Sequence, residues 1–245
     1  LINKPGLSNM TISQEVSQAH WDNFRRDPLY YWAYRSALLR LGHYYSGFYK
    51  YQQENPNPEL ALNYLSHATV VSLSPETMYL IGHVEDKLGN KEKAFEYFVE
   101  AAKRGSRTAH YALGDLYIDD EHVRYDPELA IFHFKEAHEM KFQDASLRLY
   151  FIYSEGKVTK QNENKAKEYL LEAVENKNAY AVFKAGTYYY DGKSGFERDR
   201  EKAKKLLLRS VDLGHSYAKN VVAYFIFDNP YLFQPTTNQL REAED

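Results

Sequence analysis

The stretch that decides the fold is residues 109–142, AHYALGDLYIDDEHVRYDPELAIFHFKEAHEMKF. Its first part places Ala109, Leu113 and Tyr117 four residues apart, which is one face of a helix. An Asp-Pro pair at 126–127 then marks the start of a second helix, because Asp is a good N-cap and Pro suits the first helical position. Neither helix can bury its apolar face alone, so the stretch predicts a helix pair that packs on neighbouring pairs.

The same landmarks recur along the chain. In the first helix of each unit a small residue precedes a Gly-like position by five residues, and in the second helix two small residues lie seven apart. Only the loop between the helices varies, which is typical of a stacked solenoid, whereas chance alanine spacing in a helical bundle is the alternative. The pairs in the first helices are Ala37 and Gly42, Thr77 and Gly82, Ala109 and Gly114, Ala145 and Tyr150, Ala181 and Gly186, and Ala218 and Ala223.

Composition sets the class of protein. The 245 residues are 44% hydrophobic and 27% charged, which is ample for a core, and no apolar run approaches the roughly 20 residues that a membrane span needs. The net charge is −3 and no basic stripe is visible, so we expect no nucleic acid partner and no membrane insertion. Cysteine is absent, which excludes disulfides and cysteine-ligated zinc. We expect a cytoplasmic location, but the chain starts at Leu1 rather than Met, so secretion is not excluded.

The repeat pattern also predicts the domain organisation. We expect a lead-in and N-terminal capping helix over residues 1–28, because the end of a solenoid must cover an open apolar face. The repeats themselves are predicted to span residues 29–228. Proline at 230 then breaks the pattern, and a C-terminal tail is predicted over 229–245.

The pattern A-x-x-x-L-G-x-x-Y, a loop, then D-x-x-x-A-x-x-x-x-x-x-A resembles the Sel-1-like repeat, a relative of the tetratricopeptide repeat. The best fits are ALGDLYIDD…DPELAIFHFKEA, RLYFIYSEG…NKAKEYLLEA and KAGTYYYDG…DREKAKKLLLRS, with a period of 36 to 37 residues. Three departures are Tyr150, which stands where Gly is expected, the short second unit, which looks like a tetratricopeptide repeat, and the over-long loop of the first unit. The resemblance covers roughly residues 30 to 228 and implies an all-α, right-handed superhelix of five to six helix pairs.

The resemblance also implies a function. Such proteins are typically scaffolds or adaptors that bind a partner protein or peptide in a concave groove. Bacterial members often act in signalling or host contact, and the Lys-, Asn- and Tyr-rich composition favours a bacterial origin. We therefore hypothesise a bacterial effector or virulence factor, located in the host cytosol if it is translocated. An RNA-binding helical repeat and a eukaryotic complex-assembly subunit are the alternatives.

The predicted binding surface uses first-helix positions around the Gly-like landmark, since these helices line the concave face of related solenoids. The set is aromatic with scattered acidic residues, and aromatic rings on a preformed groove give a large contact area at low entropic cost. We expect a partner with apolar anchors and some basic character, the alternative being that many of these rings pack between helices. The candidates are Arg35, His43, Tyr79, His83, Asp86, Tyr111, Asp115, Asp119, Phe151, Tyr180, Phe183, Thr187, Tyr190 and Tyr224.

No motif in the sequence predicts catalysis, a cofactor or a metal site. His133 and His138 lie five residues apart, about 140° around a helix, which makes a poor metal pair. The acidic run at 119–122 lacks the alternating oxygen ligands and the Gly of a calcium loop. We expect a protein that is not an enzyme, and the rival hypothesis of an enzyme would need a pocket with convergent polar groups.

Overall fold

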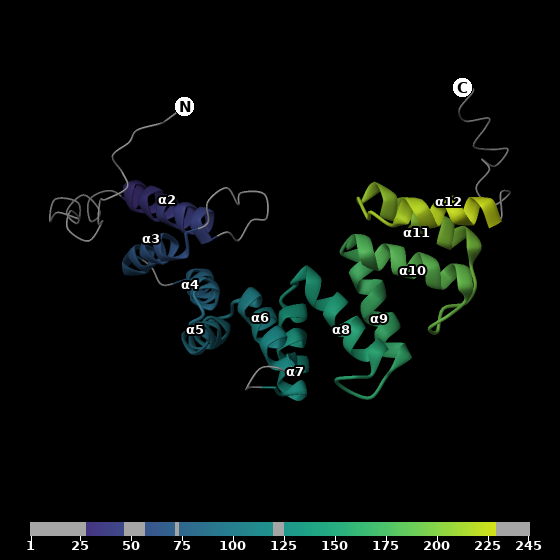
Figure 1. Cartoon of the computed structure of the whole chain (residues 1–245), viewed down its shortest axis with the longest axis horizontal. Coiled ribbons are helices and arrows are strands. Elements are labelled where there is room, and N and C mark those ends of the chain that lie inside the picture. Colours follow the sequence, from purple (N-terminus) through teal and green to yellow (C-terminus); the bar gives the residue numbers. More distant parts are fainter. Residues whose placement is uncertain (1–27, 47–56, 72–73, 120–124, 229–245) are drawn as a thin grey trace, which may run out of the picture. The chain divides into compact units, whose positions relative to one another are not determined.

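The computed structural model describes residues 28–46, 57–71, 74–119 and 125–228, and within these ranges every regular element is an α-helix (Figure 1). The predicted capping helix before residue 28 and the predicted tail after residue 228 lie outside the described residues. The helices group into two compact units, which divide after Ser106 and are considered separately.

Unit 1 holds two helix pairs, and each helix packs on the next one along the chain. Its core is formed by Leu65 of the first pair and by Leu80, Ile81 and Val84 of the second, all of them buried. The helices of unit 1 are α2 (Pro28–Ser46), α3 (Pro58–Val71), α4 (Pro75–Lys87) and α5 (Lys91–Lys103).

Unit 2 holds three helix pairs and one further helix, again packed in chain order. The helices of unit 2 are α6 (Arg107–Ile118), α7 (Pro127–Glu139), α8 (Gln143–Glu155), α9 (Glu163–Glu175), α10 (Ala179–Asp191), α11 (Arg200–Asp212) and α12 (Ala218–Asp228). One core runs from α7 to α10, from Phe134 through Leu149 and Leu170 to Val182, and a second core joins α10, α11 and α12.

Helix starts and ends follow the local chemistry that the sequence predicts. The Asp126 carboxylate accepts hydrogen bonds from the backbone N–H groups of Glu128 and Leu129 at 3.1 and 3.0 Å, so α7 begins at Pro127. At the other end of a helix, Gly192 takes a left-handed conformation with φ of +71° and terminates α10. These signals fix where the variable loops lie, and therefore which residues each helix presents.

Close contact between the two helices of a pair depends on the Gly landmark of the first helix. A Cβ atom added at Gly114 would lie 2.8 Å from the ring of Phe134, which is closer than real Cβ contacts allow. The bulky side chain of the second helix therefore packs directly on the backbone of the first. The same contact pairs Gly42 with Leu65, Gly82 with Phe98, and Gly186 with Leu207.

Tyr150 departs from this rule, as the sequence indicated. It occupies the landmark position of α8 but is only 3% exposed. Its hydroxyl forms a 2.9 Å hydrogen bond with the hydroxyl of Tyr188 on α10, and burial together with that bond raises the pKa of Tyr150. The large side chain of Tyr150 is thus buried with its hydroxyl hydrogen-bonded to a residue of the next repeat.

A histidine pair, His110 buried and His133 half-buried, joins α6 to α7. The Nδ1 atoms of His110 and His133 lie 2.9 Å apart, so one ring must donate and the other accept, and the ring of Tyr117 stacks on His133. Burial, and secondly the neighbouring His110, lower the pKa of His133 from 6.5 to about 4. Both rings cannot be protonated while this contact is kept.

The Gly landmark can be tested with Gly114→Ala. Alanine favours helices by about 1 kcal/mol over glycine, but the clash with Phe134 should outweigh this gain and give a net destabilisation of about 1–3 kcal/mol. Urea denaturation followed by circular dichroism measures the effect. In a Phe134→Leu background the smaller, flexible side chain should make the same substitution less costly. A neutral or stabilising Gly114→Ala would contradict the proposed packing.

The histidine pair predicts a pH dependence of stability. Because the pKa of His133 is lower in the folded protein, the unfolded chain binds more protons below pH 6.5, and stability should fall as the pH falls from 6.5 to about 4. His133→Asn should flatten this decline in urea denaturation series at several pH values. His67→Gln, which removes a histidine of α3 outside the pair, serves as the control and should leave the decline intact. An unchanged decline in His133→Asn would refute the assignment.

Candidate functional site

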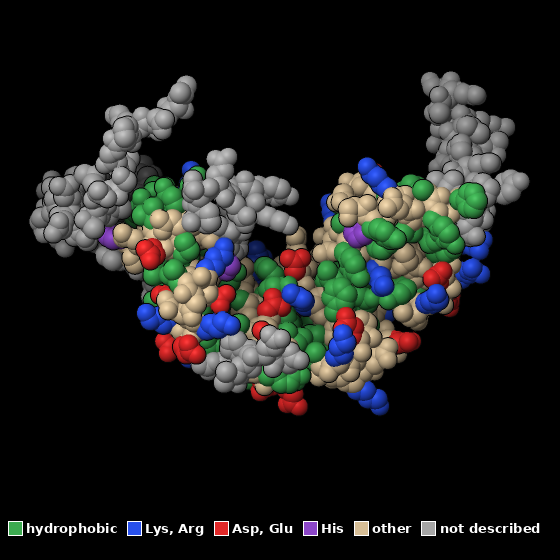
Figure 2. All heavy atoms as spheres, viewed as in Figure 1, with side chains coloured by type: hydrophobic (Ala, Val, Ile, Leu, Met, Phe, Trp, Pro, Cys, Tyr) green, Lys and Arg blue, Asp and Glu red, His purple; other side chains and the backbone are tan. Residues whose placement is uncertain are grey.

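The first helices of unit 2 present a continuous set of ring-bearing and charged side chains, which we call the aromatic strip. Most of its members are half-buried, so one side of each packs on the protein and the other stays accessible. Figure 2 shows hydrophobic side chains gathered over α8 and α10 on the face in view. The aromatic strip consists of Tyr111 on α6, Arg148 and Phe151 on α8, Tyr180 and Phe183 on α10, and His215 in the turn before α12.

Arg148 connects the strip between α6 and α8. Its Nε donates to the hydroxyl of Tyr111 at 2.9 Å, and a terminal nitrogen lies 3.1 Å from the Asp115 carboxylate. The guanidinium carbon also lies 5.9 Å from the centre of the Tyr111 ring. Burial raises the pKa of Asp115, and the charge of Arg148 opposes that increase. The Asp115 charge is therefore already compensated within the protein and offers a basic partner less than the sequence suggested.

Ring contacts continue the strip from α8 to the end of the unit. The ring centres of Phe151 and Tyr180 lie 5.6 Å apart, and Tyr180 lies 6.0 Å from His215. Phe183 stacks on His215 at 4.4 Å with an angle of 12° between the planes. Rings that hold one another in this way lose little further conformational freedom when a ligand covers them.

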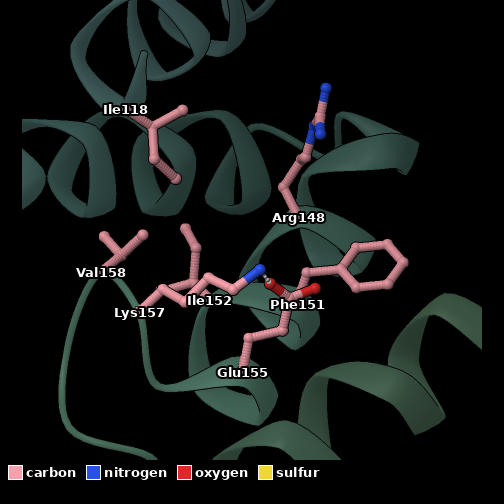
Figure 3. A pocket seen from close by; sticks show the side chains of 7 residues that line it. All are labelled: Ile118, Arg148, Phe151, Ile152, Glu155, Lys157 and Val158. Atoms are coloured by element: carbon pink, nitrogen blue, oxygen red, sulfur yellow. Dashed lines mark ion pairs between the residues drawn. The ribbon is translucent and has the colours of Figure 1, made fainter. Parts of the chain in front are cut away.

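A cavity of about 350 Å³ adjoins the strip between α6, α8 and the loop after α8 (Figure 3). Ile118, Ile152 and Val158 form its apolar wall, and Figure 3 shows these three side chains around a common hollow. At the rim the ammonium of Lys157 lies 3.0 Å from the Glu155 carboxylate. The wall is apolar and the rim charges are paired, so the cavity suits an uncharged, apolar group.

Sequence reasoning missed this cavity. Ile118 lies one helical turn after Gly114, and this spacing indicated only that it belongs to a helix face. Val158 lies in a loop, and the repeat pattern does not predict the path of that loop. Ile152 is buried and reads as ordinary core. The one sequence signal that could have indicated the cavity is Val158, an apolar residue in an otherwise polar loop.

Four of the predicted site residues belong to the strip, and Asp115 contacts it. Other predicted positions in unit 2 lie elsewhere: Asp119 is exposed at the end of the described part of α6, and the Thr187 hydroxyl donates to the Lys184 carbonyl at 2.8 Å. Tyr224 on α12 is 62% exposed, next to Phe227, which is 87% exposed. These residues remain predictions as partner contacts.

The expectation that Tyr190 faces the groove is wrong. The residue is 5% exposed, and its ring stacks on Phe225 of α12 with a centre-to-centre distance of 3.8 Å. Tyr190 lies two helical turns after Phe183 and so on the same face of α10, but the packing of α12 covers that end of the helix. Tyr190 therefore holds two helices together.

The predicted residues of unit 1 form a separate group. The ring of Tyr79 packs on Phe98 at 5.6 Å and stacks on His83 at 6.3 Å, so Tyr79 contributes to the packing of α4 on α5. Burial lowers the pKa of both His83 and His43, which favours their neutral forms. The remaining predicted positions in this unit are Arg35, which is half-buried, and Asp86, which is exposed.

One polar cluster in unit 2 has the composition of a hydrolytic triad. The Ser146 hydroxyl lies 3.1 Å from Nδ1 of His138, and Nε2 of His138 lies 3.2 Å from the Glu172 carboxylate. Ser146 is fully buried, so no substrate can reach its oxygen. The cluster joins α7, α8 and α9, and its role is structural.

Within the ranges that the structure covers, no group of three or more His, Asp or Glu side chains could hold a metal ion. Among the described helices, none combines the length and the apolar character that a membrane crossing requires.

A sequence model of the Sel1 repeat matches the chain five times and covers well over half of it. This confirms the resemblance that the Gly landmark and the Asp-to-Ala spacing predicted. Comparison with curated proteins found no match. The matched residues are 35–68, 73–106, 108–141, 146–178 and 179–215.

Solved structures with a similar fold include a Sel1 repeat protein from Oxalobacter formigenes, with a TM-score of 0.66 and 20% identity over 85% of this chain and 84% of that one. A second is a protective antigen of uropathogenic Escherichia coli that displays an SLR fold, with a TM-score of 0.66 and 20% identity. That alignment covers 90% of this chain but 47% of the other. At this identity the likeness concerns the fold alone, and it confirms the predicted class of all-α helix-pair repeats.

Proposed function

This chain belongs to the Sel1 repeat family, and on that premise we propose that it is a scaffold or adaptor that binds a protein segment along the aromatic strip of unit 2. Sel1 repeat proteins generally mediate protein–protein interactions. The family therefore supplies the class of activity, and the strip with its cavity supplies the candidate surface.

The observation that carries this proposal is the combination of ordered rings with an adjacent apolar cavity. Half-buried aromatic rings are the side chains most often found as interface hot spots. The 350 Å³ cavity beside Phe151 has room for one large apolar side chain of a partner. We infer that the partner presents an apolar anchor, which enters the cavity, and neighbouring residues that cover the rings.

The charges around the strip indicate whether apolar contacts or ion pairs would supply most of the binding affinity. Arg148 pairs with Asp115, and Lys157 pairs with Glu155, so the charges nearest to the cavity are already compensated. A partner would gain mainly from covering apolar surface rather than from new ion pairs. The basic character that the sequence suggested for the partner is therefore secondary to its apolar anchor.

The finer hypothesis of a bacterial effector or virulence factor that engages host proteins rests on weaker support. The two structural relatives described above come from bacteria, and one of them is a protective antigen of a pathogenic strain. Identification of the partner decides this hypothesis, because a host protein supports it and a bacterial one does not.

Substitution of two strip rings tests the proposed surface. We expect Phe151→Ser combined with Phe183→Ser to weaken partner binding about 30- to 1,000-fold, since loss of each hot-spot ring typically costs about 1–2 kcal/mol. Partners are first identified by quantitative affinity purification from bacterial and eukaryotic lysates with the unaltered protein, and the affinity of the best partner is then measured for each variant.

Phe132→Ser is the matched control, because Phe132 is a 50% exposed phenylalanine on α7, a second helix of the repeat, and lies outside the strip. It should bind like the unaltered protein. Val158→Phe adds a second comparison, because it narrows the cavity without removing a strip ring and should also weaken binding. Full affinity in the double variant, with its circular dichroism spectrum unchanged, would remove the strip as the partner site.

A further inference from the structure

A second cavity of unit 2, outside the aromatic strip, is lined by a group of cations. It has a volume of about 700 Å³ and opens beside the loop that joins α10 to α11. We call its four cationic side chains the basic cluster. They are Lys167 of α9, Arg198 of the loop, and Arg200 and Lys202 of the first turn of α11.

The basic cluster keeps its charge uncompensated. In the described part of the chain, no carboxylate oxygen lies within ion-pair distance of any of its four side chains. Cations elsewhere in unit 2 do find such partners, as Arg148 does with Asp115 and Lys193 with Asp191. Other cations of unit 2, such as Lys135 and Lys177, also lack an ion pair within the described residues, so what distinguishes the basic cluster is that four cations line one cavity.

The cations are nevertheless held in position by neutral groups. The ammonium of Lys167 donates to the Gly195 carbonyl at 2.7 Å and lies 5.0 Å from the centre of the Phe196 ring. The ammonium of Lys202 lies 4.3 Å from the centre of the Tyr189 ring. Contacts with carbonyls and ring faces orient a cation without neutralising it.

The two arginines are fixed by one tyrosine. Nε of Arg198 donates to the Tyr190 carbonyl at 3.1 Å, and the guanidinium carbon of Arg200 lies 5.2 Å from the centre of the Tyr190 ring. Tyr190 is itself anchored in the core by its stacking on Phe225. The arginines therefore extend from a rigid part of unit 2 rather than from a loose loop.

The cavity lining also contains three acidic residues, which do not cancel the cluster. The Asp199 carboxylate accepts a hydrogen bond from the backbone N–H of Lys202 at 2.9 Å and so is used as the N-cap of α11. Glu197 and Glu201 are exposed, and neither pairs with a member of the cluster.

We propose that the basic cluster binds a phosphoryl group carried by a protein partner. The protein-borne source rests on the proposed function, because a protein-binding module meets its anions on proteins. A phosphoryl group accepts hydrogen bonds on three oxygens at once, so it can use several N–H donors that line one cavity, whereas a carboxylate has only two oxygens. Arginine adds a planar fork that matches phosphate geometry.

The first test uses inorganic phosphate, which needs no knowledge of the partner. Amide signals of Lys167, Gly195 and Lys202 are followed by NMR while phosphate is added at constant ionic strength. We expect saturable shifts at millimolar phosphate. Lys167→Gln combined with Arg200→Gln should weaken this binding at least ten-fold, whereas Lys205→Gln, an exposed lysine of α11 outside the cavity, should not.

Shifts that rise linearly without saturation, or that persist unchanged in the Lys167→Gln and Arg200→Gln variant, overturn the proposal. The protein-borne source is tested with a phosphoserine peptide library and its dephosphorylated form. Retention of the phosphorylated library alone supports the proposal, and equal retention of both overturns it. The variant with Phe151→Ser and Phe183→Ser should still bind phosphate, so failure of the strip and failure of the basic cluster are distinguished.

Discussion

Contact between a residue without a side chain on one helix and a bulky residue on the next is the interaction on which the rest depends. Where Gly114 meets Phe134, the ring lies directly against the helix backbone, and two helices approach closely enough to share one core. The contact recurs in unit 2 where Gly186 of α10 meets Leu207 of α11. Part of the strip follows from that regularity, because Tyr111 and Phe183 occupy the same repeat position, two residues after Ala109 and Ala181.

Much of the fold was predictable because its determinants are local. Caps such as Asp126 act on the backbone two or three residues away, and a glycine with positive φ ends a helix wherever it stands. Family membership and the all-α repeat class followed from the spacing of these signals. Tyr150 was visible as an exception, but its hydroxyl contact with Tyr188 was not, since nothing local links two residues 38 positions apart.

The candidate site was less predictable because it depends on contacts between repeats. Phe151, Tyr180 and Phe183 were expected at the surface and do form part of the strip. Tyr190 was wrongly expected at the surface, because the sequence of α10 does not show that α12 covers the end of that helix. The ion pair of Arg148 with Asp115 also joins separate helices, and it changed the expected charge of the surface.

The hydroxyl pair of Tyr150 and Tyr188 has a consequence for cooperativity. In a linear array of repeats, the strength of each junction decides whether neighbours open separately or together. A buried hydrogen bond between α8 and α10 costs free energy if either repeat opens alone, because it leaves a buried hydroxyl unsatisfied. The bond therefore favours opening of the fourth and fifth repeats together, and these repeats carry Phe151 and Tyr180. A ligand that contacts both rings therefore binds two repeats whose opening is coupled.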